Sequence, residues 1–238
     1  VKVIKLSRGM DFSNLPKKEV RECEEGLHYY VETSNFNEAA TNCGDNLKKQ
    51  REIIKALSVL HKVTHSMVKD QSSEMMQVQS ARSHVINYRP FGDKETMAKN
   101  AVVSAISHIT FLYEIFNPLF PEIENFRCSI GVAQGEFLVT NLGADGKREV
   151  ISLGICANQG AKIINGHGNI SITKVTYDLL PQDLKDIFEK RKLNGKIIFS
   201  SPSIRWSKYP ELKKKYAEDF DKEALKSLTE DYRASLPL

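Results

Sequence analysis

The residues whose spacing could do chemistry gather between residues 126 and 164, where glycines recur along a strand, a loop and a helix. Gly131 and Gly135 flank the end of a predicted strand, and Gly154 precedes the helix that carries Asn158. Glycines along such a path can let backbone N–H groups hold a phosphate chain. They can equally serve tight turns, so the glycines alone leave both interpretations open.

Metal-ligating residues show one weak pattern. His61 and His65 lie four residues apart on a predicted helix and could form a two-ligand face, but no third ligand has a matching spacing. We therefore predict no metal site there. The cysteines are widely separated and form no CxxC pair, which favours reduced thiols over a disulfide framework or a zinc site; they are Cys23, Cys43, Cys128 and Cys156.

Hydrophobic periodicity predicts the elements that position these residues. Helical spacing follows Asn46 and returns, most clearly, from Ala98 to Phe116. Strands are predicted over residues 27–31, 75–80, 84–88, 126–132, 149–153, 170–173 and 196–200. Residues 135–139 are expected to pair with the preceding strand as a hairpin, and residues 141–147 to form a loop. A helix is expected from Asn158, with residues 165–168 as its C-terminal cap. Residues 174–190 are also expected to be helical. This order predicts an α+β sandwich with helices packed on one sheet.

Three segments are expected along the chain. Residues 1–26 are polar and irregular and form a lead-in, residues 27–200 form the main domain, and residues 201–238 form a helical C-terminal extension around Trp206. The apolar helix from Ala98 to Phe116 predicts a need for cover from a second copy of the chain.

Composition excludes several protein classes. The chain has 238 residues, of which 41% are hydrophobic, so it can bury a full core and is not disordered. The net charge of +4 is spread out, and the run Lys213 to Lys215 precedes Glu218 and Asp219, which favours a solvated helix face over nucleic-acid binding. No run is long enough to cross a bilayer, and the first residues lack a signal-peptide pattern, so a cytoplasmic protein is expected.

Three consecutive stretches carry a resemblance to a known family. Residues 129–135 (SIGVAQG), 140–143 (TNLG) and 150–163 (VISLGICANQGAKI) match, in order and in register, motifs in the C-terminal half of class III nucleotidyl cyclases. The order of elements upstream agrees, so the resemblance extends over about residues 27–199. It implies a ferredoxin-like βαββαβ domain with helices on a mainly antiparallel sheet. It also implies a homodimer, because the family's site lies between two subunits.

The resemblance assigns roles to individual residues. Asn158 matches the family's ribose-orienting asparagine, and Lys162 takes the place of its transition-state arginine, keeping the charge but losing the planar fork. Glu32 stands where the first metal-binding aspartate is expected. Arg82 stands at the second carboxylate position, where a cation would oppose metal binding, and it is expected among the nucleotide-binding residues instead.

The residues expected to contact the base also depart from the family. Val78 and Ile155 replace the lysine and aspartate that read adenine, and neither can form a hydrogen bond with a base. Gln77, Gln79 and Ser80 could read another base, such as a pyrimidine. Phe36, in the first motif, is a further nucleotide-contact candidate, with core or dimer packing as the alternative.

Two functions follow as hypotheses. In the first, the chain is a degenerate cyclase homology domain that binds a nucleoside triphosphate, a cyclic nucleotide or a partner at a dimer cleft in signalling. In the second, it is an active but atypical cyclase that converts a nucleoside triphosphate to a 3′,5′-cyclic nucleotide and pyrophosphate. Mg²⁺ or Mn²⁺ is expected as a cofactor only in the second case.

Overall fold

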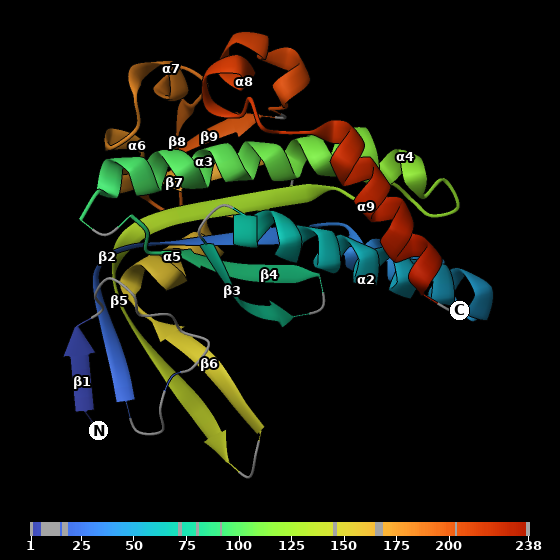
Figure 1. Ribbon diagram of the computed structural model, residues 1–238, viewed down its shortest axis with the longest axis horizontal. Helices are drawn as coiled ribbons and strands as arrows, with labels where there is room; N and C mark the ends of the chain where they lie inside the picture. The colour runs from blue at the N-terminus through green and yellow to red at the C-terminus, as the bar shows by residue number, and fades with distance from the viewer. Residues whose placement is uncertain are drawn as a thin grey trace.

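A nine-stranded sheet organises the part of the chain that the computed structural model describes, which comprises residues 2–5, 15, 19–70, 73–79, 81–90, 92–144, 147–164, 169–202 and 204–236 (Figure 1). The strands are β1 (Lys2–Lys5), β2 (Glu19–Thr33), β3 (Ser73–Gln79), β4 (Arg82–Asn87), β5 (Cys128–Ala144), β6 (Lys147–Leu153), β7 (Asn169–Thr173), β8 (Glu189–Leu193) and β9 (Lys196–Pro202). Their order is β3-β4-β2-β5-β7-β9-β8, with β1 beside β2 and β6 beside β5. All pairs except β1–β2 and β5–β7 are antiparallel, which confirms the predicted fold class.

The helices are α1 (Phe36–Asn42), α2 (Leu47–Asp70), α3 (Lys94–Phe111), α4 (Asn117–Leu119), α5 (Ile155–Lys162), α6 (Lys174–Asp178), α7 (Gln182–Lys185), α8 (Pro210–Tyr216) and α9 (Lys222–Ser235). A π-helical turn joins α3 to α4, and a short 3₁₀ turn precedes α8. Neighbouring residues of β2 point to opposite faces of the sheet. Leu27 and Tyr29 face the main core, which α2 and α3 cover, and we call this the α3 face.

Helix α3 is buried around most of its circumference, which is typical of a helix covered on several sides. The cover on its outer side comes from the same chain. The indole Nε1 of Trp206 donates a hydrogen bond to Ser107 Oγ (2.9 Å), and the Trp206 backbone N–H donates to Thr110 Oγ1 (3.0 Å). The argument that this helix needs a second copy as cover is therefore wrong, whereas the dimer itself stays a prediction.

The strands β2 and β5 run well beyond the helix-covered part of the sheet. Their far ends pair with each other and with β1 and β6, and Figure 1 shows this arm pointing away from α3. The irregular backbone expected for residues 19–26 is thus wrong, because β2 begins at Glu19. Residues 6–14 and 16–18 lie outside the described part of the chain, and the domain boundary at residue 26 stays a prediction.

Two further expectations are corrected by the strands. Strand β5 passes through Gly135 without reversing, so the hairpin predicted there and the loop predicted from residue 141 are wrong; residues 145–146 lie outside the description. A Cβ on Gly135 would lie 3.1 Å from Cys156 Cβ of α5, so close packing explains this glycine. The helix predicted to residue 190 ends earlier, with β8 starting at Glu189. The predicted cap at 165–168 also lies outside the described residues.

Candidate functional site

The two positions expected to hold metal carboxylates face each other across neighbouring strands. Glu32 of β2 is in register with Arg82 of β4, and Arg82 Nη2 donates to Glu32 Oε2 at 2.6 Å. The side chains are about one-third exposed, at 30% for Glu32 and 38% for Arg82. A guanidinium and a carboxylate at this distance form a charge-assisted hydrogen bond. The pair is electrically neutral where two carboxylates would carry two negative charges.

The opposite neighbour of Glu32 offers no second carboxylate. Ser129 of β5 is in register with Glu32, and its hydroxyl oxygen is buried with no hydrogen-bond partner among the described residues. Within the described chain, no group of three histidine, cysteine or carboxylate side chains is arranged to hold a metal ion. The residues present therefore do not fit a two-metal centre. Glu32 as a metal ligand stays a prediction that this arrangement does not favour.

Helix α5 packs tightly on the sheet face opposite α3. A Cβ on Gly131 of β5 would lie 2.1 Å from the Gly160 carbonyl oxygen, and a Cβ on Gly160 would lie 3.1 Å from the Tyr30 ring. Only glycine at these positions permits so close an approach of helix and strand. We call this side, which carries His28, Tyr30 and Glu32 of β2 with Arg82 and His84 of β4, the α5 face.

The predicted catalytic pair lies on the outer side of α5. Asn158 and Lys162 are exposed, whereas Cys156, Ala157 and Gly160 are buried against the sheet. The helix cap is Gly154, and Asn158 instead donates its backbone N–H to the Gly154 carbonyl within the first turn. Asn158 therefore lies inside the first turn and is not the N-terminal cap of α5. Within the described part of the chain, both polar side chains are exposed and can meet a ligand.

The positions predicted to contact a base are apolar and separated. Val78 is 44% exposed and in register with Ser83, whose hydroxyl lies 3.2 Å from His61 Nδ1 of α2. Val78 therefore lies on the α2 side of its hairpin. Ile155 begins α5 and is 77% exposed. Among the polar alternatives, Gln79 is in register with Arg82, whereas the Gln77 side chain and Ser80 lie outside the description.

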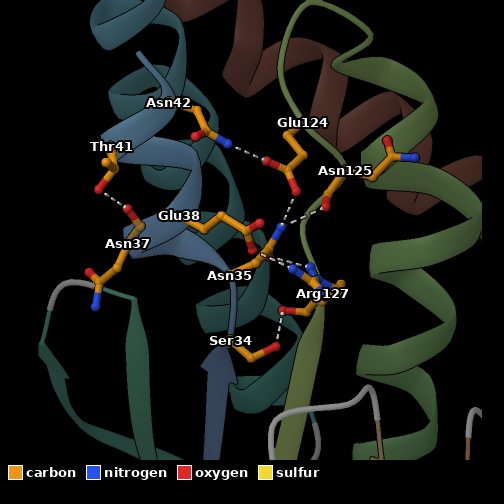
Figure 2. Close-up of polar contacts among 9 residues, drawn as sticks. All are labelled: Ser34, Asn35, Asn37, Glu38, Thr41, Asn42, Glu124, Asn125 and Arg127. Carbon is orange, nitrogen blue, oxygen red and sulfur yellow. Dashed lines mark hydrogen bonds and ion pairs between the residues drawn. The ribbon is translucent and has the colours of Figure 1, made fainter. Parts of the chain in front are cut away.

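A polar network that the sequence did not predict fixes the turn after Glu32 (Figure 2). The side chain of Asn35 is buried; its Oδ1 accepts from Arg127 N–H (2.7 Å), and its Nδ2 donates to the Asn125 carbonyl (3.0 Å). Arg127 Nη2 in turn donates to Glu38 Oε2 at 2.6 Å. Phe36, next in the chain, packs against the main core, which favours the packing interpretation over a nucleotide contact.

A second network lies beneath α5. His28 Nδ1 and His84 Nε2 are 2.7 Å apart, and His28 Nε2 lies 3.2 Å from Ser152 Oγ. The Tyr30 ring stacks on His84 with 4.3 Å between centroids. Burial, with the neighbouring histidine adding to it, holds the pKa of His28 well below its usual value, and burial lowers the pKa of His84 to about 4. Both rings are therefore neutral at pH 7.

Comparisons with known proteins agree with this geometry at the level of the fold. No family model matches the sequence, and no curated protein does. Among solved structures, a class III adenylyl cyclase-like ATP-binding protein from Pseudomonas aeruginosa covers 98% of this chain at 17% identity, with a TM-score of 0.75. The chain spans about half of that protein, 48% of its length.

Two cyclase domains are also similar. The guanylate cyclase domain of RhGC from Catenaria anguillulae, solved with GTP, matches 75% of this chain and 95% of its own at 16% identity, with a TM-score of 0.60. The adenylyl cyclase CyaB from Pseudomonas aeruginosa matches 76% of this chain and 94% of its own at 15% identity, with a TM-score of 0.62. The chain thus has the fold of class III cyclase domains, which confirms the resemblance in its sequence. Among the described helices, none combines the length and apolar character needed to span a membrane.

Proposed function

We propose that this chain is a cyclase-fold domain that binds a nucleotide in a homodimer cleft without cyclising it, and that it serves in cytoplasmic signalling. The observation that carries the proposal is the ion pair between Glu32 and Arg82, at 2.6 Å. Cyclisation requires the ribose 3′-oxygen to attack the α-phosphate while metal ions activate the nucleophile and neutralise the triphosphate. A neutral ion pair where two carboxylates would hold those ions removes that chemistry.

The remaining residues support binding more than catalysis. Lys162 supplies a point charge for a phosphate, but it lacks the fork with which arginine would follow charge developing on the α-phosphate. Asn158 and Lys162 lie on the exposed side of α5, where a ligand can reach both. A structure that covers nearly all of this chain is that of an ATP-binding protein, which supports a nucleotide as the ligand class.

Exposed apolar side chains support the homodimer. Leu138 and Leu153 form a cross-strand pair on the arm and are 40% and 58% exposed, and Ile155 at the start of α5 is 77% exposed. Leu142, further along the arm, is 54% exposed. Exposed apolar residues of this size mark interaction surfaces. A second copy of the chain that covered them would bury their apolar area.

The test combines turnover with binding. We expect calorimetry to show binding of at least one of ATP, GTP, CTP and UTP, and chromatography to show no cyclic product from any of them with Mg²⁺ or Mn²⁺. Turnover of any one, a pyrimidine nucleotide included, would establish the atypical cyclase instead. Lack of binding by all four would overturn the proposal. Light scattering checks the dimer, and a monomeric mass at micromolar concentration would contradict it.

A further inference from the structure

We infer that the guanidinium of Arg82 takes the place of a divalent cation on the α5 face, so that a nucleotide binds here without metal. The inference rests on the proposed function, because it concerns how the phosphates of the bound nucleotide are neutralised. It names a ligand state, the metal-free nucleotide, and a residue that contacts its phosphates.

The charge at the site favours this ligand. Two carboxylates repel a polyphosphate, and a divalent cation between them must offset that repulsion. Here Glu32 and Arg82 cancel each other, so the phosphates meet no net negative charge from the pair. Lys162 of α5 and Arg82 of β4 then supply two positive charges on the side of the sheet that α5 covers.

The geometry of Arg82 leaves donors for a phosphate. Glu32 is its one hydrogen-bond partner within the described chain, and that contact uses Nη2. A guanidinium has five N–H donors in a planar fork that matches two phosphate oxygens. With 38% of its side chain exposed, Arg82 can reach a ligand while Glu32 fixes its orientation.

The same geometry disfavours a metal ion. Mg²⁺ is usually held by one or two carboxylates together with phosphate oxygens and water. The one carboxylate here, on Glu32, already accepts from a cation, and a metal ion beside it would meet the positive charge of Arg82 at close range. The described residues offer no alternative group of three ligands nearby.

The experiment titrates the full chain with ATP, GTP, CTP and UTP in turn, once with excess EDTA and once with excess MgCl₂. The inference predicts binding in EDTA, with no gain in affinity from Mg²⁺. Binding that requires Mg²⁺ would overturn it while leaving the proposed nucleotide binding intact. Absence of binding in both conditions would overturn both.

Two variants sharpen the result. Arg82→Ala should weaken binding in EDTA by about 10-fold to 100-fold, the range for one charged hydrogen bond, whereas Lys192→Ala on the exposed edge strand β8 should leave it unchanged. Arg82→Asp restores two facing carboxylates, so it should abolish binding in EDTA and regain it with Mg²⁺ or Mn²⁺. If Arg82→Ala binds like the wild type, Arg82 contacts no phosphate and the inference fails. Thermal melts report whether each variant folds. If the variants do not fold, the wild-type titrations in EDTA and in Mg²⁺ still test the inference.

Discussion

The two faces of the sheet differ in character although the same strands form both: the α3 face is an apolar core, and the α5 face carries polar and aromatic contacts. On the α3 face, Leu27 and Tyr29 of β2 are fully buried among apolar side chains, and Ser107 of α3 accepts a hydrogen bond from Trp206. On the α5 face, the neighbouring residues of β2 are His28, Tyr30 and Glu32, each of which contacts a polar or aromatic partner on β4. Alternation along one strand therefore separates stability from chemistry. Partly exposed residues on the α5 face, such as Glu32 and Arg82, can change while the fold persists.

The largest expected effect is a loss of stability from a substitution on the α3 face. Trp206→Ala removes a side chain that is 1% exposed and the hydrogen bond to Ser107, and it should lower the free energy of unfolding by about 3–5 kcal/mol. Urea denaturation followed by circular dichroism measures this loss. Nucleotide affinity of the folded fraction should not change, because Trp206 lies across the sheet from α5. A loss below about 1 kcal/mol would contradict the assignment of Trp206 to the core.

Acid should act mainly on the α5 face. Burial lowers the pKa values of His28, His84 and His108 in the folded chain, the last two to about 4. Above the unfolded value of about 6.5, the rings are neutral in both states and contribute no pH dependence. Below about pH 6.5 the histidines are protonated in the unfolded chain but stay neutral in the folded chain. The free energy of unfolding therefore falls by about 1.4 kcal/mol per pH unit for each histidine.

Denaturation midpoints measured between neutral pH and about pH 5 check this slope. Two of the three histidines lie on the α5 face, and His84→Gln should reduce the slope by one histidine's share. The matched variant His108→Gln removes the histidine that lies in α3, and it should reduce the slope by the same amount. Stability that stays constant over this range would contradict the prediction.

The smallest effects concern ligand binding. Lys162→Ala should weaken nucleotide binding by about 1.5–3 kcal/mol, as for a charged hydrogen bond, and Asn158→Ala by about 1 kcal/mol. Both residues are exposed, so the free energy of unfolding should change by less than about 0.5 kcal/mol. Calorimetric titration measures the affinities, with Lys192→Ala as the control. If both variants bind like the wild type, α5 does not carry the nucleotide contact.

Strong local patterns made much of the fold predictable. The apolar period of α3 and the motifs around α5 placed both helices. The resemblance assigned Glu32 and Arg82 to the two carboxylate positions, and the structure brings them into register. The misses have physical causes. Gly135 resembles a turn residue, yet it serves the close approach of α5. Strand β8 carries charged side chains, as exposed edge strands do, so its sequence lacks the alternation of a half-buried strand.

The two polar networks, around Asn35 and around His28, were beyond prediction because their partners are distant in sequence. His28 and His84 are 56 residues apart, and Asn35 contacts residues about 90 further along. Only the register of β2 with its neighbours brings these side chains together, and a single sequence does not contain that register. Because the same register places Arg82 beside Glu32, the arginine that replaces the second carboxylate forms an ion pair and is not an isolated cation.

The contact between Trp206 and α3 has a consequence for biosynthesis. The two partners of its indole hydrogen bond are 99 residues apart, so a ribosome completes α3 long before it makes the residues that cover it. Contacts of such high sequence separation slow folding, and an apolar helix left uncovered in the meantime favours aggregation. The yield of folded chain should therefore depend on chaperone supply and synthesis speed more than the stability of the finished protein would suggest.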